Sequence, residues 1–124
     1  MVPLVYALAQ SGVFQPFWSC EGHADPNGEI YRLPQVWFYA ASQVHIQLLI
    51  EKIASLCSQK LVAIDWRINL TYSQDEFLPA YSLAPQVTED SSHNLSEMQQ
   101  ELAIIAEHVR DLSQLAKEKA DKHN

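Results

Sequence analysis

Residues 62–72 have the sequence VAIDWRINLTY, and this stretch decides the fold. Apolar side chains stand at every second position, and small or polar ones lie between them. A β-strand points successive side chains to opposite faces, so the pattern predicts a long strand over 62–72 with one buried face. The apolar set is Val62, Ile64, Trp66, Ile68, Leu70 and Tyr72. The other face carries Asp65, Arg67 and Asn69, which form either a polar binding surface or an ordinary solvated face.

The flanking segments predict a helix before this strand and a short strand after it. Ser42 can cap a helix that continues to about residue 58, because apolar residues recur there at helical spacing. These residues are Ile46, Leu49, Ile50, Ile53, Leu56 and Cys57. The pattern therefore places Cys57 on the buried stripe. Residues 73–76 are expected to turn the chain, and 79–83, which begin with proline, to return as an edge strand.

The first 40 residues predict a helix followed by a hairpin. A proline near the start suits the first turn of a helix over 3–11. Residues 13–19 are apolar and aromatic and predict a strand, which Pro16 restricts to a sheet edge or a bulge. The turn-forming residues Asp25-Pro26-Asn27-Gly28 then precede a second apolar strand over 35–40. A hairpin with a long loop is the simplest account.

A long C-terminal helix is predicted over 94–120. Asn94 with Glu97 three residues later matches the capping-box pattern. The apolar residues that follow alternate spacings of three and four, as in a coiled-coil seam. They are Leu95, Met98, Leu102, Ile105, Val109, Leu112 and Ala116. Packing on the chain's own sheet explains this stripe best, because three heptads are only about the threshold for a coiled coil. A homodimer through 95–116 is the alternative.

The order helix, hairpin, helix, hairpin, helix predicts a two-layer α+β fold, with two helix-connected β-hairpins and a long C-terminal helix. The chain has 124 residues, of which 48% are hydrophobic, which suits one domain with a real core. We expect a single domain over 1–124, with a core of helix and sheet in 1–85 and the C-terminal helix over 94–120.

Composition narrows the class of partner and the compartment. The net charge of −7 repels phosphate backbones and makes broad nucleic-acid binding unlikely. Two cysteines do not make a disulfide framework, the N-terminus lacks the positive region of a signal peptide, and no stretch approaches the roughly 20 apolar residues that cross a bilayer. A cytoplasmic protein with reduced thiols and no membrane partner is expected.

The segment Phe17-Trp18-Ser19-Cys20-Glu21-Gly22-His23 is the candidate site, because it places a thiol, a carboxylate, a glycine and an imidazole behind aromatic residues. Cys20 and His23 have a spacing that can chelate a metal ion, although two ligands do not complete a site. Alternatively, Cys20 is a nucleophile activated by His23, with Glu21 or Asp65 orienting the imidazole. The alternative without a functional role is that Cys20 is simply a small buried residue.

The interpretation we favour is a small-molecule pocket. Its ligand-binding residues would be Trp18, Ser19, Cys20, Glu21, Gly22, His23, Asp65 and Arg67. Trp18, Trp37, Tyr39 and Trp66 would supply flat walls. Gly22 would give a ligand access to the backbone, and Arg67 would pair with a carboxylate or phosphate. An ion pair between Arg67 and Asp65 or Glu21 on the sheet face is the equally weighted alternative for Arg67.

The segment Ser19-Cys20-Glu21-Gly22-His23 resembles an S-C-x-G-H pattern found in small uncharacterised bacterial and phage proteins. It is also distantly similar to the S-S-C-S-G-R segment of the wybutosine-synthesising tRNA methyltransferase family. The likeness covers about the first 70 residues, and Ser19, Cys20 and Gly22 match the enzyme pattern while Trp18 and His23 depart from it. It implies an α+β fold with the motif in a ligand-binding loop. For the enzyme family it further implies methyl transfer with S-adenosylmethionine.

The sequence therefore predicts a small intracellular protein that binds a small molecule or an anion at the S-C-E-G-H segment. The alternatives are an enzyme of methyltransferase-like or thiol-dependent type, and an interaction module that dimerises through the C-terminal helix. No pattern identifies a cofactor.

Overall fold

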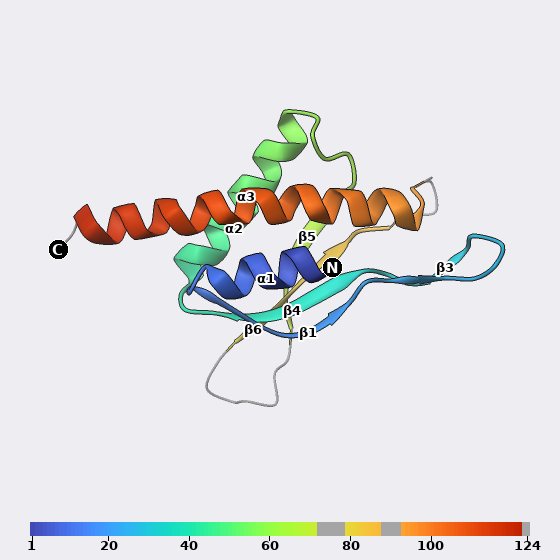
Figure 1. Ribbon diagram of the computed structural model, residues 1–124, viewed down its shortest axis with the longest axis horizontal. Helices are drawn as coiled ribbons and strands as arrows, with labels where there is room; N and C mark the ends of the chain where they lie inside the picture. Colours follow the sequence, from blue (N-terminus) through green and yellow to red (C-terminus); the bar gives the residue numbers. More distant parts are fainter. Residues whose placement is uncertain (72–78, 88–92, 123–124) are drawn as a thin grey trace.

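The computed structural model describes residues 1–71, 79–87 and 93–122, with the backbone alone described over 113–122. Three helices are separated by two groups of strands along the described chain (Figure 1). The first 40 residues form α1 (Val2–Gln10), β1 (Phe14–Cys20), β2 (His23–Ala24), β3 (Ile30–Arg32) and β4 (Gln35–Ala40). The remainder forms α2 (Gln43–Ser58), β5 (Trp66–Thr71), β6 (Ala80–Pro85) and α3 (Leu95–Lys122).

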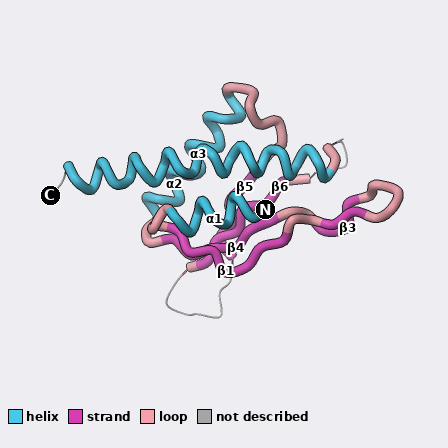
Figure 2. The backbone as a smooth tube through the Cα atoms, in the orientation of Figure 1, coloured by secondary structure: helices cyan, strands magenta, loops and turns pink. Residues whose placement is uncertain are grey.

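The main sheet has the strand order β1-β4-β6-β5, and all neighbouring strands are antiparallel. β1 and β4 form the first hairpin, β5 and β6 form the second, and α2 connects them. All three helices lie on the same side of the sheet (Figures 1 and 2). The predicted α+β fold with two helix-connected hairpins and a C-terminal helix is confirmed.

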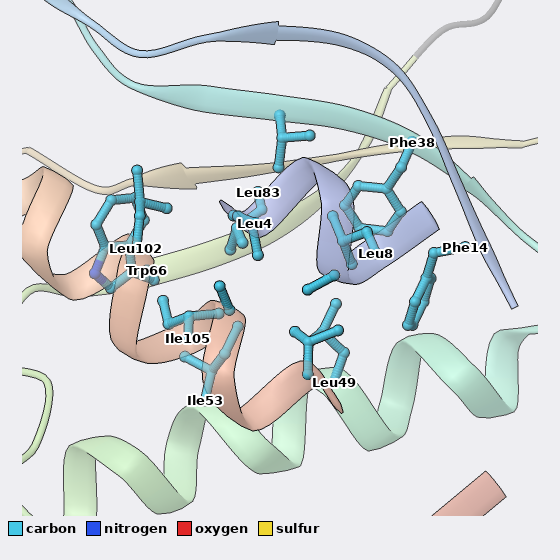
Figure 3. Close-up of a cluster of buried hydrophobic side chains, with 14 of the residues drawn as sticks. Leu4, Leu8, Phe14, Phe38, Leu49, Ile53, Trp66, Leu83, Leu102 and Ile105 are labelled. Atoms are coloured by element: carbon cyan, nitrogen blue, oxygen red, sulfur yellow. The ribbon is translucent and has the colours of Figure 1, made fainter. Parts of the chain in front are cut away.

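One hydrophobic core fills the space between the sheet and the helices (Figure 3). Val36 and Phe38 of β4 are fully buried, and Leu4 and Leu8 of α1 pack into the same cluster. Phe14 of β1 meets Phe38 edge to face, with ring centroids 5.5 Å apart. Burial of an aliphatic or aromatic side chain of this size contributes roughly 1.5–3 kcal/mol, so this core accounts for the position of β1 against β4 and α1.

The apolar stripe of α3 packs inside the chain. Met98, Leu102, Ile105 and Val109 are each at most 2% exposed. α3 contacts α1 and α2, and Figure 1 shows it running along α1 and crossing α2. The heptad spacing over 98–109 is thus explained by packing within one chain, which leaves these residues unavailable for a coiled coil. At the start of α3, the amide of Glu97 donates to Asn94 Oδ1 (2.8 Å), as the predicted cap requires.

The first hairpin is longer and more elaborate than its sequence suggests. Pro16 lies in β1, which is an outer strand, and the register shifts between Pro16 and Trp18. Both predicted consequences of the proline, an edge position and a bulge, are therefore present. The predicted loop between the strands holds a second two-stranded sheet, β2–β3, which extends the hairpin as an arm (Figure 1). Asp25 closes its turn by accepting the amides of Asn27 and Glu29 at 2.9 Å.

The predicted strand over 62–72 begins four residues later than expected. β5 starts at Trp66, because the amides of Ala63 and Ile64 donate to the carboxylate of Glu101 on α3 instead of to another strand. The indole Nε1 of Trp66 donates to the same carboxylate at 2.9 Å. Burial alternates over 62–67, so the period of two was correct about the faces there and wrong about the backbone partner. Leu70, which the pattern placed on the buried face, is 71% exposed. The predicted turn at 73–76 lies outside the described residues.

The returning strand is central rather than at an edge. β6 lies between β4 and β5, contrary to the prediction drawn from its proline. Pro79 precedes the strand, so it removes no ladder hydrogen bond. Pro85 ends β6 beyond its last pair with β4, Leu83 with Val36, and therefore removes no bond of that ladder either.

The prediction that Cys57 lies on the buried stripe of α2 is also wrong, because its side chain is exposed. The inward stripe consists of Ile46, Leu49, Ile53 and Leu56. Ile50 and Cys57 flank this stripe, and Ile50 is 46% exposed. The apolar face of α2 is thus wider than the surface that the rest of the chain covers.

Candidate functional site

The S-C-E-G-H segment joins β1 to the arm. Cys20 ends β1, His23 begins β2, and Glu21 and Gly22 form the junction between them. The side-chain amide of Gln99 on α3 donates to the carbonyl oxygen of Glu21 at 3.1 Å. The candidate site is therefore fixed at the end of an outer strand, with its backbone attached to the first turns of α3.

Gly22 has a packing role that differs from the predicted one. Its φ is +90°, and a Cβ at this position would come within 2.6 Å of Leu95 Cδ1 and 3.0 Å of Pro34 Cδ. Both the backbone angle and the close approach require glycine. The predicted access for a ligand is therefore incorrect on this side of the backbone, because Leu95 and Pro34 occupy the space.

A cleft of about 680 Å³ opens between α1 and the segment that joins β1 to the arm. Met1 and four residues of α1 line one side of the cleft: Val2, Val5, Tyr6 and Ala9. From the hairpin it is lined by Trp18, Ser19, Cys20, Glu21, His23 and Arg32. The predicted residues Trp18 to His23, with the exception of Gly22, thus share one concave surface. The helix supplies an apolar wall, and the hairpin supplies the polar groups.

The apolar wall is open to solvent. Val2 is 78% exposed and Tyr6 is 56% exposed, although both are large apolar or aromatic side chains on a short helix. Trp18 on the opposite wall is 42% exposed. An aromatic side chain that is half exposed beside a cleft retains apolar surface that a ligand can cover.

The sequence did not indicate Arg32 as a site residue. Arg32 is the register partner of His23 across the β2–β3 pair, and the neighbouring Tyr31 stacks on His23 with ring centroids 5.9 Å apart. The strong turn at 25–28 was the available signal, because a turn of that kind can close two strands as well as a loop. Regular strands extended from this turn would pair His23 with Tyr31, and it is the register shift between His23 and Ala24 that brings Arg32 opposite His23.

Asp65 and Arg67 are not part of this cleft. They lie at and before the start of β5, at the opposite edge of the sheet from β1. Arg67 Nη2 and Nε donate to Asp65 Oδ2 at 2.9 and 3.1 Å, and both side chains are 56% exposed. The hydrogen bond to Asp65, followed by the charge of Asp65, raises the pKa of Arg67. The predicted grouping of these residues with the S-C-E-G-H segment is wrong, and the ion-pair alternative for Arg67 is confirmed.

The four aromatic side chains that were predicted to line the pocket also lie in different places. Trp18 and Trp37 contact each other with ring centroids 5.4 Å apart, and Phe17 stacks on Tyr39 at 4.5 Å. Trp66 lies in the core and is only 5% exposed. Of the four, only Trp18 lines the cleft.

Cys20 and His23 differ in their surroundings. Cys20 is 9% exposed and forms part of the cleft wall, whereas His23 is exposed on the arm. Among the described residues, no group of three or more histidine, cysteine, aspartate or glutamate side chains is arranged to hold a metal ion. The cleft residues therefore offer polar binding groups around a buried thiol.

No family model matches the sequence, and no curated protein and no solved structure gives a significant match. Within the described part of the chain, no helix combines the length and the apolar character needed to cross a membrane.

Proposed function

We propose that the protein binds a small molecule with an apolar body and an anionic group in the cleft between α1 and β1. The observation that carries this proposal is the composition of that one cleft, which joins the exposed apolar face of α1 to the polar groups of the S-C-E-G-H segment and Arg32. A cleft of about 680 Å³ is of the size that holds small-molecule ligands, and few convergent polar groups in an apolar setting are typical of such sites.

Charge selects the anion. Arg32 and His23 stand side by side on the arm, and among the described residues that line the cleft only Glu21 is acidic. An arginine guanidinium can donate two parallel hydrogen bonds to a carboxylate or phosphate. In a chain of net charge −7, Arg32 and His23 together form a local site for one anionic group and not a surface for a polyanion.

The apolar body would lie against α1. Val5 and Tyr6 line the cleft one residue apart, and Trp18 faces them from the hairpin. Cys20 would contribute wall surface between these groups, because its burial suits a small apolar side chain better than a nucleophile. The two free cysteines support a reducing cytoplasmic setting for this binding.

The resemblance carried by Ser19, Cys20 and Gly22 makes S-adenosylmethionine the first compound to test. It carries a carboxylate and a flat adenine ring, the two kinds of group that the cleft would recognise, together with a sulfonium and an ammonium that make it cationic overall. Binding of this compound would favour the methyltransferase-like alternative, whereas binding of other aromatic carboxylates or nucleoside monophosphates would support a binding protein of the same class.

The test is a thermal-shift screen with these three groups of compounds, followed by calorimetric titration of the hits. We expect Arg32→Gln to weaken binding of a hit by about tenfold, because one charge-assisted hydrogen bond is lost. Tyr6→Ala should weaken it through lost apolar contact. The matched control is Arg67→Gln, an equally simple loss of an exposed arginine at the other edge of the sheet. Unchanged affinity in Arg32→Gln, or an equal loss in Arg67→Gln, would overturn the proposal.

A further inference from the structure

β5 is an outer strand without the features that usually protect a sheet edge. Its register with β6 runs without a shift from Trp66 to Thr71, and the strand contains no proline. Its one charged residue, Arg67, is paired with Asp65. β1, the other outer strand, carries both a proline and a bulge. Long regular edges with little charge can pair with another strand, and proteins commonly prevent this with prolines, bulges or lysines.

The backbone groups of β5 that point outward can be identified from its ladder. The amide of Gln86 donates to the carbonyl oxygen of Asp65 at 2.7 Å, so Asp65 faces the neighbouring chain segment. Residues of an antiparallel strand face the partner alternately. Arg67 and Asn69 therefore direct their amides and carbonyls to β6, whereas Ile68 and Leu70 direct theirs away from the sheet. Among the described strands, none pairs with that outer side.

An apolar wall accompanies this edge. Ile50, Ala54 and Cys57 of α2 follow one another at spacings of four and three, and all three are exposed. Together with Ile68 they line a groove of about 290 Å³ between α2 and β5. Leu70, two residues further along the strand, is 71% exposed. The groove thus combines unpaired backbone groups with apolar surface, which is what an added strand would satisfy.

Charge favours a second copy of the chain as the added strand. Among the described residues that line the groove, two are charged, Asp65 and Arg67, and these neutralise each other. Elsewhere the chain has a large acidic excess, with a net charge of −7, which opposes self-association. A neutral apolar edge on an acidic chain is the surface on which two copies can approach most readily.

We propose that two copies associate through antiparallel pairing of their β5 strands about a two-fold axis at Ile68. In this register Ile68, whose backbone amide and carbonyl point away from the sheet, pairs with the partner's Ile68. Leu70 then lies opposite the partner's Trp66. Arg67 lies opposite the partner's Asn69, so like charges do not oppose each other directly. The two sheets become one eight-stranded sheet, and the exposed Leu70 is covered. A two-fold interface of this kind uses the same surface on both copies.

Sedimentation velocity over a concentration series tests the proposal. The wild-type chain should sediment with twice the mass of one chain, and Leu70→Lys should sediment as a monomer whose circular-dichroism spectrum matches that of the folded wild type. Tyr31→Lys on the arm is the matched control, since Tyr31 is also 71% exposed, and it should remain dimeric. A monomeric wild type at every concentration, or a dimeric Leu70→Lys, would overturn the proposal.

Cross-linking tests the register. In a background with both native cysteines replaced by serine, Ile68→Cys should form a disulfide-linked dimer on mild oxidation, because directly opposed strand residues lie within disulfide range. Asn69→Cys should cross-link far less, since the two-fold places it opposite Arg67. A dimer that cross-links through Asn69→Cys in preference to Ile68→Cys would exclude this axis. Pairing of β5 only with a strand of another protein would leave both variants monomeric and would equally exclude the proposal.

Discussion

The two outer strands end the sheet in opposite ways. β1 is interrupted by Pro16 and a bulge and leads into an arm, and the groups beside it are side chains: an indole, a thiol, a carboxylate, an imidazole and the guanidinium of Arg32. β5 is regular, and it exposes an outer row of backbone groups next to apolar side chains. Side chains recognise small molecules and backbone edges recognise strands, so the difference is consistent with the ligand proposed for the β1 edge and the second copy proposed for the β5 edge.

α3 holds both edges, by different means. Near its start, Gln99 donates to the carbonyl of Glu21 and Leu95 packs against Gly22. Two residues after Gln99, Glu101 accepts the amides of Ala63 and Ile64 just before β5. The β1 edge is thus held mainly by close packing at a glycine, and the β5 edge by a carboxylate. Each attachment can be removed separately.

Gly22→Ala should have the largest effect. The new Cβ would enter a backbone conformation that L-residues avoid and would approach Leu95 Cδ1 to 2.6 Å. Strain from the positive φ and overpacking together should lower the free energy of unfolding by about 3 kcal/mol. Chemical denaturation monitored by tryptophan fluorescence measures this, and the cleft should lose affinity for its ligand while β5 pairing persists.

The matched control is Gly28→Ala in the turn of the arm. Gly28 has nearly the same φ, +87°, but a Cβ there would meet no atom within 4 Å. Its cost should therefore be limited to the backbone term, about 1 kcal/mol. An equal loss of unfolding free energy at the two glycines would show that the Leu95 side chain moves aside without penalty. Close packing would then not be what holds the β1 edge.

Glu101→Ala should have the next largest effect, at the other edge. Three donors lose their acceptor: the amides of Ala63 and Ile64 and the indole nitrogen of Trp66. Because the site is only partly buried, water can replace some of these bonds, and we expect a loss of about 2 kcal/mol. Glu107→Ala, at an exposed position of the same helix, should stay within about 0.5 kcal/mol of the wild type in the same denaturation assay. A Glu101→Ala variant as stable as Glu107→Ala would contradict the carboxylate attachment.

The elements of the fold followed from local patterns, whereas their order in the sheet did not. Helical spacing identified the three helices, and the proline in β1 correctly indicated an edge and a bulge. Pro79, just before β6, led to a wrong edge prediction, because the effect of a proline depends on which amides the neighbouring strands need, and that is a property of the assembled sheet. The early part of the 62–72 pattern misled for a related reason. Its amides bond to Glu101, 37 or more residues away in sequence.

The candidate site was predicted where side chains are adjacent in sequence and missed where they are adjacent only in space. Trp18 to His23 share the cleft because they follow one another along the hairpin. Arg32 joins them through the β2–β3 register, and Asp65 and Arg67 are excluded by the strand order. Arg67 was predicted as a site residue and Arg32 was not considered, because the register that pairs Arg32 with His23 contains a shift that no local pattern indicates.

The smallest predicted effect is a change in the alkylation rate of Cys57, and this rate reports directly on the β5 edge. Its thiol lines the groove, and partial burial, together with the charges of Glu101 and Asp65, raises its pKa. At a fixed pH below that pKa, the thiolate fraction and the alkylation rate should be lower than for the unfolded chain. Asp65→Asn in a Cys20→Ser background should shift the pH–rate profile of alkylation to lower pH, because a negative charge that disfavours the thiolate is removed.

Two comparisons make this measurement decisive. Glu29→Gln removes a carboxylate on the arm, far along the sheet from β5, and should leave the profile unchanged. Pairing of two copies through β5 should additionally slow alkylation as the protein concentration rises, since the groove is then covered, and Leu70→Lys should abolish that concentration dependence. If Asp65→Asn left the pH–rate profile unchanged, the charge of Asp65 would have no influence on the Cys57 thiol. The neutrality of the β5 edge would then depend on its apolar residues alone.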